Sequence, residues 1–261
     1  MKNRVLPAYG GLTAAIVITT TMDATGYAAF SALPLFPLAA LFWAVQRFST
    51  TEIGLTWGRA SDYPVALAYP CLVLGVMALL AYLLGATDTS GADWNKATLN
   101  IVLMSTTGIL VGMLTEEGFF RGWLWAALKR SGKTDKHVLV WTTLAFTAWH
   151  VSAITLDTGF DVPANEVPVY LVNATIIGGV FGILRMVSGS IVVPSVCHAV
   201  WNGLDYPLYG FGERAGALGI EQTHIFGPEV GIVGIGLNLL FIAILWRKYA
   251  TPVADKCASI H

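Results

Sequence analysis

Six polar side chains with the chemistry of acid–base catalysis fall inside strongly apolar stretches of the sequence. They are Glu116, Glu117, Arg121, His150, His198 and Asn202. An ionisable group at membrane depth is costly, and such a group is therefore a functional candidate by default. Amide hydrolysis needs a base for water, donors for the oxyanion and an acid for the leaving amine. Carboxylate, imidazole and carboxamide groups can supply all three.

The carboxylates and the arginine are spaced for one helix. Glu117 and Arg121 are four residues apart, so they can form an ion pair on one helix face. Glu116 is rotated about 100° away from Glu117. Glu116 can therefore face a cavity while Arg121 neutralises its neighbour. A carboxylate removed from water binds a proton more readily, so Glu116 could take a proton from water and later give it to an amine.

The other candidates repeat the four-residue spacing. His198 and Asn202 can point to one place, and Phe146 precedes His150 by the same interval and could form a wall of the pocket. Imidazole and carboxamide N–H groups at His198 and Asn202 can donate hydrogen bonds to an oxyanion. With 1.5 Å per residue, Glu116 and His150 each lie roughly 20 Å from one membrane edge, Asn202 roughly 18 Å and His198 roughly 12 Å. Three non-adjacent helices are therefore expected to bring these groups to a similar level.

The elements that carry these residues are predicted to be transmembrane helices. The chain has 261 residues, of which 55% are hydrophobic and 12% charged, and its mean hydropathy is +0.65. A soluble domain has about 25% charged residues. A spanning helix needs about 20 mostly apolar residues, and we find eight such segments. They are approximately 6–22, 26–46, 63–85, 98–127, 137–156, 167–185, 191–209 and 228–246.

Charge placement supports an eight-span, all-α bundle. Twelve Lys and Arg residues fall at one set of span ends, and only Lys96 and Arg214 fall at the opposite set. Since basic loops stay in the cytoplasm, both termini are expected to be cytoplasmic. We predict a single integral membrane domain over residues 1–261, with a catalytic core at about 98–209. The protein would be a multi-pass protein of the cell membrane that contacts the lipid bilayer. Its net charge of -1, without a basic run, indicates no nucleic-acid partner.

The polar clusters match three motifs of a known family. The segment Glu116–Arg121 resembles the EExxxR box of the CPBP family of CAAX proteases and bacteriocin-processing enzymes, also called the Abi family. Residues 146–150 resemble its FxxxH motif, and residues 198–202 resemble its HxxxN/D motif. All three occur in the family's order, and the resemblance covers about residues 98–209.

The resemblance implies an intramembrane glutamate-dependent endopeptidase, related to the type II CAAX prenyl protease. Glu116 and His150 would then activate a water molecule, while His198 and Asn202 would stabilise the oxyanion. Glu117, Arg121 and Phe146 would support the site. The family also implies a site without a metal or other cofactor. The substrate would be a peptide or a membrane protein, and the sequence does not select a prenylated one.

Structural and metal-dependent alternatives stay open at this point. The Glu116, Glu117 and Arg121 cluster could be an ion-pair network that only fixes helix register. Zinc is the minority alternative, with Glu116, His150 and His198 as ligands. No HExxH motif is present to support it. Asp205 could support the site or lie near the surface.

Two other functions also fit the sequence. The chain could be a non-catalytic member of the same fold that acts as a partner-binding or immunity protein, although a scaffold would not need all the motif residues together. It could instead be a proton-coupled carrier, since buried Glu and His residues suit proton relays. No inverted repeat is visible to support a carrier. Four glycines could leave room for a water-filled cavity or simply pack helices; they are Gly108, Gly112, Gly178 and Gly179.

Overall fold

The protein is described by a computed structural model over residues 5–212 and 214–249. This part of the chain is predominantly helical with almost no strand, which confirms the predicted all-α bundle. Three of the twelve basic residues in the charge count lie outside the described residues: Lys2, Arg4 and Lys256. Both termini lie there too, so their cytoplasmic placement stays a prediction.

The first half of the described chain contains eight helical elements that lead up to the polar segment. They are α1 (Leu6–Ala24), η2 (Ala28–Phe30), α2 (Leu35–Gln46), α3 (Thr50–Ile53), η3 (Ala60–Asp62), α4 (Tyr63–Leu83), α5 (Trp94–Leu114) and the π-helix η4 (Glu117–Leu124). Helix starts carry the expected signals. The Asp93 side chain accepts a hydrogen bond from the backbone N–H of Lys96 at the start of α5, as an N-cap residue does.

The second half is helical apart from one short ribbon. Its helices are α6 (Trp125–Arg130), α7 (Asp135–Trp149), α8 (Val151–Thr155), α9 (Val167–Ser188), α10 (Val192–Tyr209), α11 (Thr223–Phe226) and α12 (Ile232–Tyr249). Strands β1 (Gly210–Phe211) and β2 (Arg214–Ala215) pair antiparallel. Gly189 ends α9 in the left-handed conformation that glycine adopts without a steric penalty.

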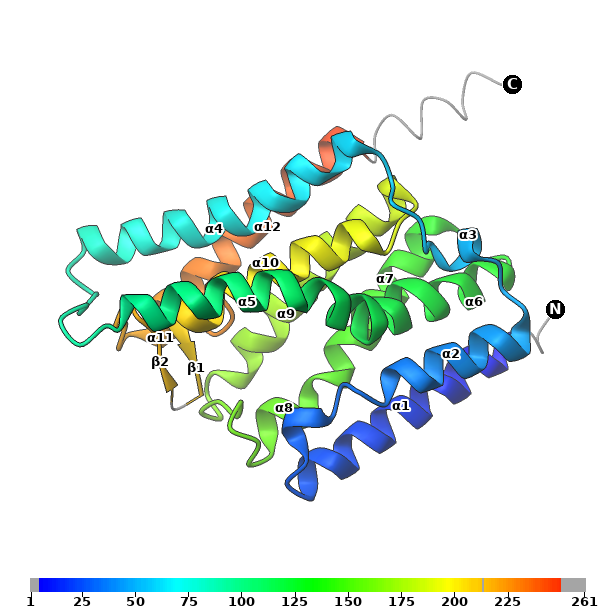
Figure 1. Ribbon diagram of the computed structural model, residues 1–261, viewed down its shortest axis with the longest axis horizontal. Helices are drawn as coiled ribbons and strands as arrows, with labels where there is room; N and C mark the ends of the chain where they lie inside the picture. Colours follow the sequence, from blue (N-terminus) through cyan, green and yellow to red (C-terminus); the bar gives the residue numbers. More distant parts are fainter. Residues whose placement is uncertain (1–4, 213, 250–261) are drawn as a thin grey trace.

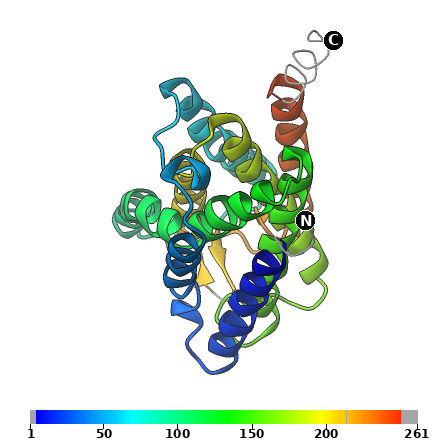
Figure 2. The ribbon, with the colours of Figure 1, turned by 90° about the vertical axis from the view of Figure 1, so that its right-hand side faces the viewer.

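The long helices form a bundle with α10 near its centre (Figure 1). Helix α10 packs against α5, α4 and α9, and α9 packs in turn against α7 and α12. Helices α1 and α2 lie at one edge of the bundle, and α4 and α12 lie at the opposite edge, both in Figure 1 and in the view turned by 90° in Figure 2. The π-helix η4 contacts α2, α5, α6 and α7, and α7 carries the candidate residue Phe146.

Helices lie in all eight predicted segments, but four of these segments differ from the prediction. The segment 26–46 contains a 3-10 helix and a turn before α2 begins at Leu35. The segment 98–127 begins earlier, at Trp94, and changes from α-helix to π-helix after a break at Thr115. The segment 137–156 is divided at His150. The last helix begins at Ile232 rather than 228, because residues 227–231 form a hydrogen-bonded turn.

Five helical stretches in the described residues are long and apolar enough to cross a membrane. They are Ala28–Gln46, Ala60–Leu83, Trp94–Arg130, Asp135–Thr155 and Val167–Ser188. Helices α1, α10 and α12 are not among them. In α10 the polar candidates His198, Asn202 and Asp205 lower the hydropathy. The count of eight spans therefore stays a prediction.

Three of the four glycines singled out in the sequence allow close packing. A Cβ at Gly108 would lie 3.2 Å from Ala199, one at Gly178 would lie 3.0 Å from Phe146, and one at Gly179 would lie 2.9 Å from Ile242. Gly112 has no neighbour within 4 Å of such a Cβ. Packing, the second of the two alternatives, therefore accounts for the first three.

The close contact between α10 and α5 at Gly203 predicts that Gly203→Ala and Gly112→Ala differ in stability. A Cβ at Gly203 in α10 would lie 2.8 Å from the backbone nitrogen and 3.1 Å from the Cα of Ser105 in α5. We expect Gly203→Ala to reduce the free energy of unfolding by about 1–3 kcal/mol, because the helices must move apart. Gly112→Ala is the matched control on α5, and its effect should stay within about 1 kcal/mol. Thermal unfolding in detergent measures both, and equal stabilities would contradict this packing account.

Candidate active site

The two neighbouring glutamates lie at the start of the π-helix. Thr115 leaves the helical region (φ -98°, ψ -96°), and the i→i+5 bonded segment η4 follows at Glu117. π-Helical turns are rare and frequent at functional sites. The sequence permits this π-helical turn because residue 118 is a glycine. A Cβ at this position would lie 2.5 Å from the carbonyl oxygen of Met113. The glycine inside the EExxxR box is therefore a structural requirement of the wide turn.

Glu117 and Arg121 form the expected ion pair, and it is fully buried. Arg121 Nη1 lies 3.2 Å from Glu117 Oε1, and both side chains are 0% exposed. Arg121 also donates from Nη2 to the carbonyl oxygen of Gly178 in α9 at 2.9 Å. Its guanidinium lies over the ring of Phe146, 4.2 Å from the centroid. The pair links η4 to α7 and α9.

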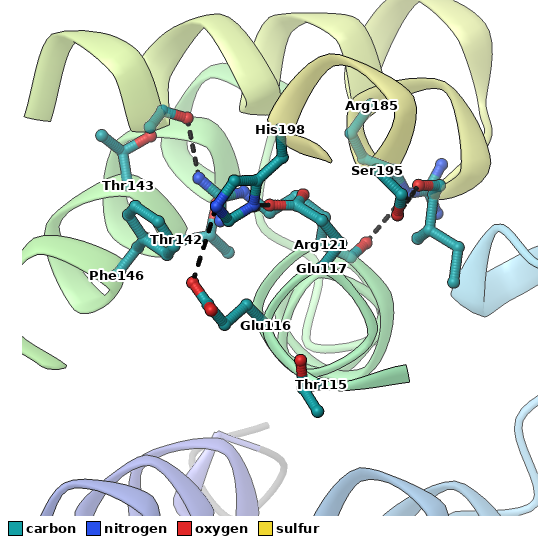
Figure 3. A network of polar contacts seen from close by, with 12 residues as sticks. Thr115, Glu116, Glu117, Arg121, Thr142, Thr143, Phe146, Arg185, Ser195 and His198 are labelled. Atoms are coloured by element: carbon teal, nitrogen blue, oxygen red, sulfur yellow. Dashed lines mark hydrogen bonds and ion pairs between the residues drawn. The ribbon is translucent and has the colours of Figure 1, made fainter. Parts of the chain in front are cut away.

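His198 lies between the two glutamates, as Figure 3 shows. Its Nδ1 is 3.1 Å from Glu117 Oε1, and its Nε2 is 3.9 Å from Glu116 Oε2. The ring stacks on Phe181, with centroids 4.7 Å apart and planes inclined by 22°. A carboxylate accepts hydrogen bonds, so Nδ1 carries a hydrogen. In the imidazolium form, which two neighbouring carboxylates stabilise, Nε2 also becomes a donor.

The ring nitrogens of His150 differ from those of His198 in their partners: Nδ1 bonds to the protein backbone and Nε2 faces Glu116 as an acceptor. Its Nδ1 lies 2.8 Å from the carbonyl oxygen of Phe146, which can only accept, so Nδ1 is the protonated nitrogen of the neutral ring. In a continuing α-helix the backbone N–H of His150 would donate to the carbonyl oxygen of Phe146. The His150 ring bonds to that oxygen instead, and the backbone N–H of His150 donates to the carbonyl oxygen of Thr147. Helix α7 therefore ends here. His150 Nε2 is left as an acceptor, 3.9 Å from Glu116 Oε2.

The cavity beside these groups contains all four predicted catalytic residues. Its polar wall includes Glu116, His150, His198 and Asn202, and Phe146 and Phe181 form apolar walls. The volume accessible to the centre of a water molecule in this cavity is about 60 Å³. About 10–15 Å³ of such volume is enough for one water molecule. Glu117 and Arg121 lie behind the wall rather than in it. Phe146 lines the cavity, as its spacing from His150 predicts.

Glu116 Oε2 is a polar atom of the cavity wall without a direct hydrogen bond to any described residue. It is buried and makes no hydrogen bond within the described ranges of the chain. Its separation of 3.9 Å from each of two imidazole nitrogens exceeds a direct hydrogen bond. A water molecule can bridge polar atoms at this separation. The arrangement can hold a water between a carboxylate and a neutral imidazole, which is the requirement of general-base catalysis.

The comparison with protein families gives the same assignment as the motifs. Residues 98–204 match the family described as type II CAAX prenyl endopeptidase Rce1-like. The chain carries an Rce1-like domain. No curated protein matches the chain. The Rce1-like domain contains all three motifs, and its family is a membrane-embedded protease family.

Two acidic residues near the Rce1-like motifs have places that the sequence did not predict. Glu229 lines the same cavity as Glu116, although it follows the matched range. We had placed it inside the last helical segment, and only its position at the edge of an apolar stretch could have marked it. Asp205 is 2% exposed, so the surface alternative for this residue is wrong. Its Oδ1 makes no hydrogen bond within the described residues.

The zinc alternative gains no geometric support from the Rce1-like domain. Within residues 5–212 and 214–249, no group of three or more His, Cys, Asp and Glu side chains is arranged to hold a metal ion. Glu116 Oε2 lies 3.9 Å from the Nε2 atoms of His150 and His198, the other members of the suggested ligand set. Independence from metal nevertheless stays a prediction.

The buried ion pair between Glu117 and Arg121 predicts a large loss of stability when one partner is removed. Arg121→Met should lower the free energy of unfolding by roughly 3–5 kcal/mol, because it leaves the charge of Glu117 buried without its partner. The double variant Glu117→Gln/Arg121→Met should lose clearly less than the sum of the two single losses. Denaturant or thermal unfolding in detergent provides the three values.

Arg130→Met is the matched control, because Arg130 pairs with Glu52 at 2.6 Å where both side chains are more than a third exposed. We expect a loss below about 1 kcal/mol there. Similar losses for Arg121→Met and Arg130→Met would contradict the assigned importance of the buried pair.

Proposed function

We propose that the chain is an intramembrane endopeptidase that hydrolyses a peptide bond with water activated by Glu116 and His150. One observation carries the proposal: a single carboxylate oxygen, Glu116 Oε2, faces Nε2 of both His150 and His198 at 3.9 Å across a cavity that has room for water. The match of residues 98–204 to the Rce1-like family, a protease family, supports the same reaction class.

His150 and Glu116 share the water in this proposal. Both His150 Nε2 and Glu116 Oε2 are acceptors, so one water molecule can donate one hydrogen to each. Their separation of 3.9 Å is less than twice a usual hydrogen-bond length of about 2.8 Å, so a single molecule reaches both. The lone pairs of its oxygen are then directed away from both acceptors and toward a bound peptide carbonyl.

The proposed reaction is balanced within these groups. The water oxygen forms a bond to the carbonyl carbon while one of its protons passes to Glu116. The carbonyl oxygen becomes an oxyanion. Glu116 then gives its proton to the amide nitrogen, and the C–N bond breaks to release an amine and a carboxylic acid. Glu116 ends the cycle ionised, as it began.

His198 and Asn202 are proposed to stabilise the oxyanion. In the imidazolium form His198 donates from Nε2 into the cavity, because its Nδ1 is already directed at Glu117. The Asn202 carboxamide, on the same helix and the same cavity wall, supplies a second donor. Removing one such donor typically slows a reaction by about 10²–10³-fold. Glu117 acts as a positioning residue through His198, Arg121 neutralises it, and Phe146 holds His150 through its carbonyl group.

The proposal includes a membrane setting and a site without a metal cofactor. The substrate would be a peptide or a membrane protein that reaches the cavity from the lipid bilayer. The chain would be a multi-pass protein of the cell membrane, with residues 98–209 as its catalytic core. The five apolar helical stretches are consistent with such a setting.

The test is cleavage of a mixed membrane-peptide library by the purified protein in detergent, with wild type compared with Glu116→Ala. Each protein is assayed with and without a strong chelator. We expect wild-type cleavage that resists the chelator, and a loss of at least about 10²-fold in Glu116→Ala, because the general base is removed.

Three results would contradict parts of the proposal. Cleavage that the chelator abolishes and zinc restores would assign the site to metal catalysis. Equal cleavage by wild type and Glu116→Ala would mean that Glu116 is not the base. Proton-dependent uptake into vesicles, with no cleavage of any peptide, would favour a carrier.

A further inference from the structure

A second carboxylate lies in the cavity and has no part in the proposed reaction. Glu229 belongs to the turn between α11 and α12, and it lines the same cavity as Glu116, His198 and Asn202. It comes from outside the three motifs. A carboxylate in an enclosed site is costly unless it has partners, so its presence there calls for a function.

The backbone at Glu229 is fixed by a buried chain of side chains. Asn173 donates from Nδ2 to the carbonyl oxygens of Glu229, at 3.0 Å, and Gly231, at 3.2 Å. Asn238 donates to Asn173 Oδ1 at 3.2 Å, and the Tyr69 hydroxyl donates to Asn238 Oδ1 at 2.7 Å. Asn173, Asn238 and Tyr69 are all 0% exposed. Three helices therefore hold this turn against the cavity.

The Glu229 side chain is fixed separately. Trp201 donates from its indole Nε1 to Glu229 Oε1 at 3.1 Å. Trp201 is 1% exposed and stacks on Tyr69, with centroids 5.2 Å apart and planes inclined by 17°. The indole N–H thus holds one oxygen of this carboxylate, and the side chain lines the cavity.

The surroundings of Glu229 suit a positively charged group. The rings of Tyr170, Trp201 and Tyr206 line the same cavity, and no lysine or arginine is among its described lining residues. Arg121, the nearby buried cation, is paired with Glu117 behind the wall. A carboxylate attracts a cation through a charge-assisted hydrogen bond, and aromatic faces attract it through their quadrupoles. Both effects are strong where water is scarce.

We propose that Glu229 is a specificity-determining residue that binds a lysine or arginine side chain of the substrate close to the scissile bond. Lysine and arginine side chains are the cations that lie along a peptide chain. The inference rests on the proposed function, because it assigns a substrate class to the same cavity. It predicts that basic peptides are preferred over neutral ones of the same length and shape.

The test uses peptides that differ only at positions flanking the cleaved bond, where lysine, arginine or norleucine is placed in turn. Wild type is assayed for kcat/KM, and Glu116→Gln, which should bind without cleaving, is assayed for peptide affinity. We expect basic peptides to be preferred over norleucine peptides roughly ten- to a hundredfold at one position, in both measurements.

Glu229→Gln should reduce that preference to about threefold or less. The substitution keeps an oxygen for the Trp201 N–H and removes only the charge, so the fold is retained. Glu229→Asp should restore part of the preference. Glu221→Gln is the matched control, because it removes an exposed carboxylate from the neighbouring loop, outside the cavity, and should leave the preference unchanged.

The results separate this inference from the proposed function. Equal affinity for basic and norleucine peptides, or a basic preference that survives Glu229→Gln, overturns the inference whether or not peptides are cut. A preference that depends on Glu229 in binding, with no cleavage by wild type, supports the inference and contradicts the proposed protease. Failure of every peptide to bind overturns the inference.

Discussion

The buried ion pair between Glu117 and Arg121 is the interaction on which the rest of the site depends. Removing two charges from water costs several kcal/mol per ion, so the pair persists only with good geometry and additional hydrogen bonds. The protein supplies these from three other helices. Gly178 in α9 offers its carbonyl, Phe146 in α7 offers its ring face, and His198 in α10 approaches the carboxylate. The helices that carry the candidate residues therefore meet around one neutralised pair.

The pair also explains how two adjacent glutamates differ. Glu117 Oε1 lies 3.2 Å from Arg121 Nη1 and 3.1 Å from His198 Nδ1, whereas Glu116 lines the cavity and its Oε2 lies 3.9 Å from the nearest imidazole nitrogens. The π-helical turn allows this by widening the helix at Gly118. Arg185 in α9 is 5% exposed and donates to the carbonyl oxygen of Arg121 at 2.8 Å. It ties the far end of the same turn to α9.

The sequence predicted the convergence of the motif residues because their chemistry leaves few alternatives. Polar groups on apolar helices must meet one another, so Glu116, His150, His198 and Asn202 on separate segments pointed to one cavity. The i, i+4 spacing was enough to predict the ion pair between Glu117 and Arg121.

The π-helix was not predictable from the sequence. An apolar segment has the same pattern of residues in an α-helix and in a π-helix, and only Gly118 distinguishes this segment. The break at His150 depends on a hydrogen bond between its own ring and the chain, and no proline or glycine signals it. Glu229 enters the cavity through long-range contacts with Asn173 and Trp201, which local spacing cannot show.

The most direct test of the account is a comparison of Glu116→Gln with Glu117→Gln, measuring both kcat on a cleaved peptide and the unfolding temperature in detergent. The account assigns the base to Glu116 and the structural charge to Glu117. It predicts that Glu116→Gln loses at least about 10²-fold in kcat while its unfolding temperature stays near that of wild type. Glu117→Gln should instead lower the unfolding temperature clearly, because Arg121 is left buried without its partner. A stable, inactive Glu117→Gln together with a fully active Glu116→Gln would contradict the account.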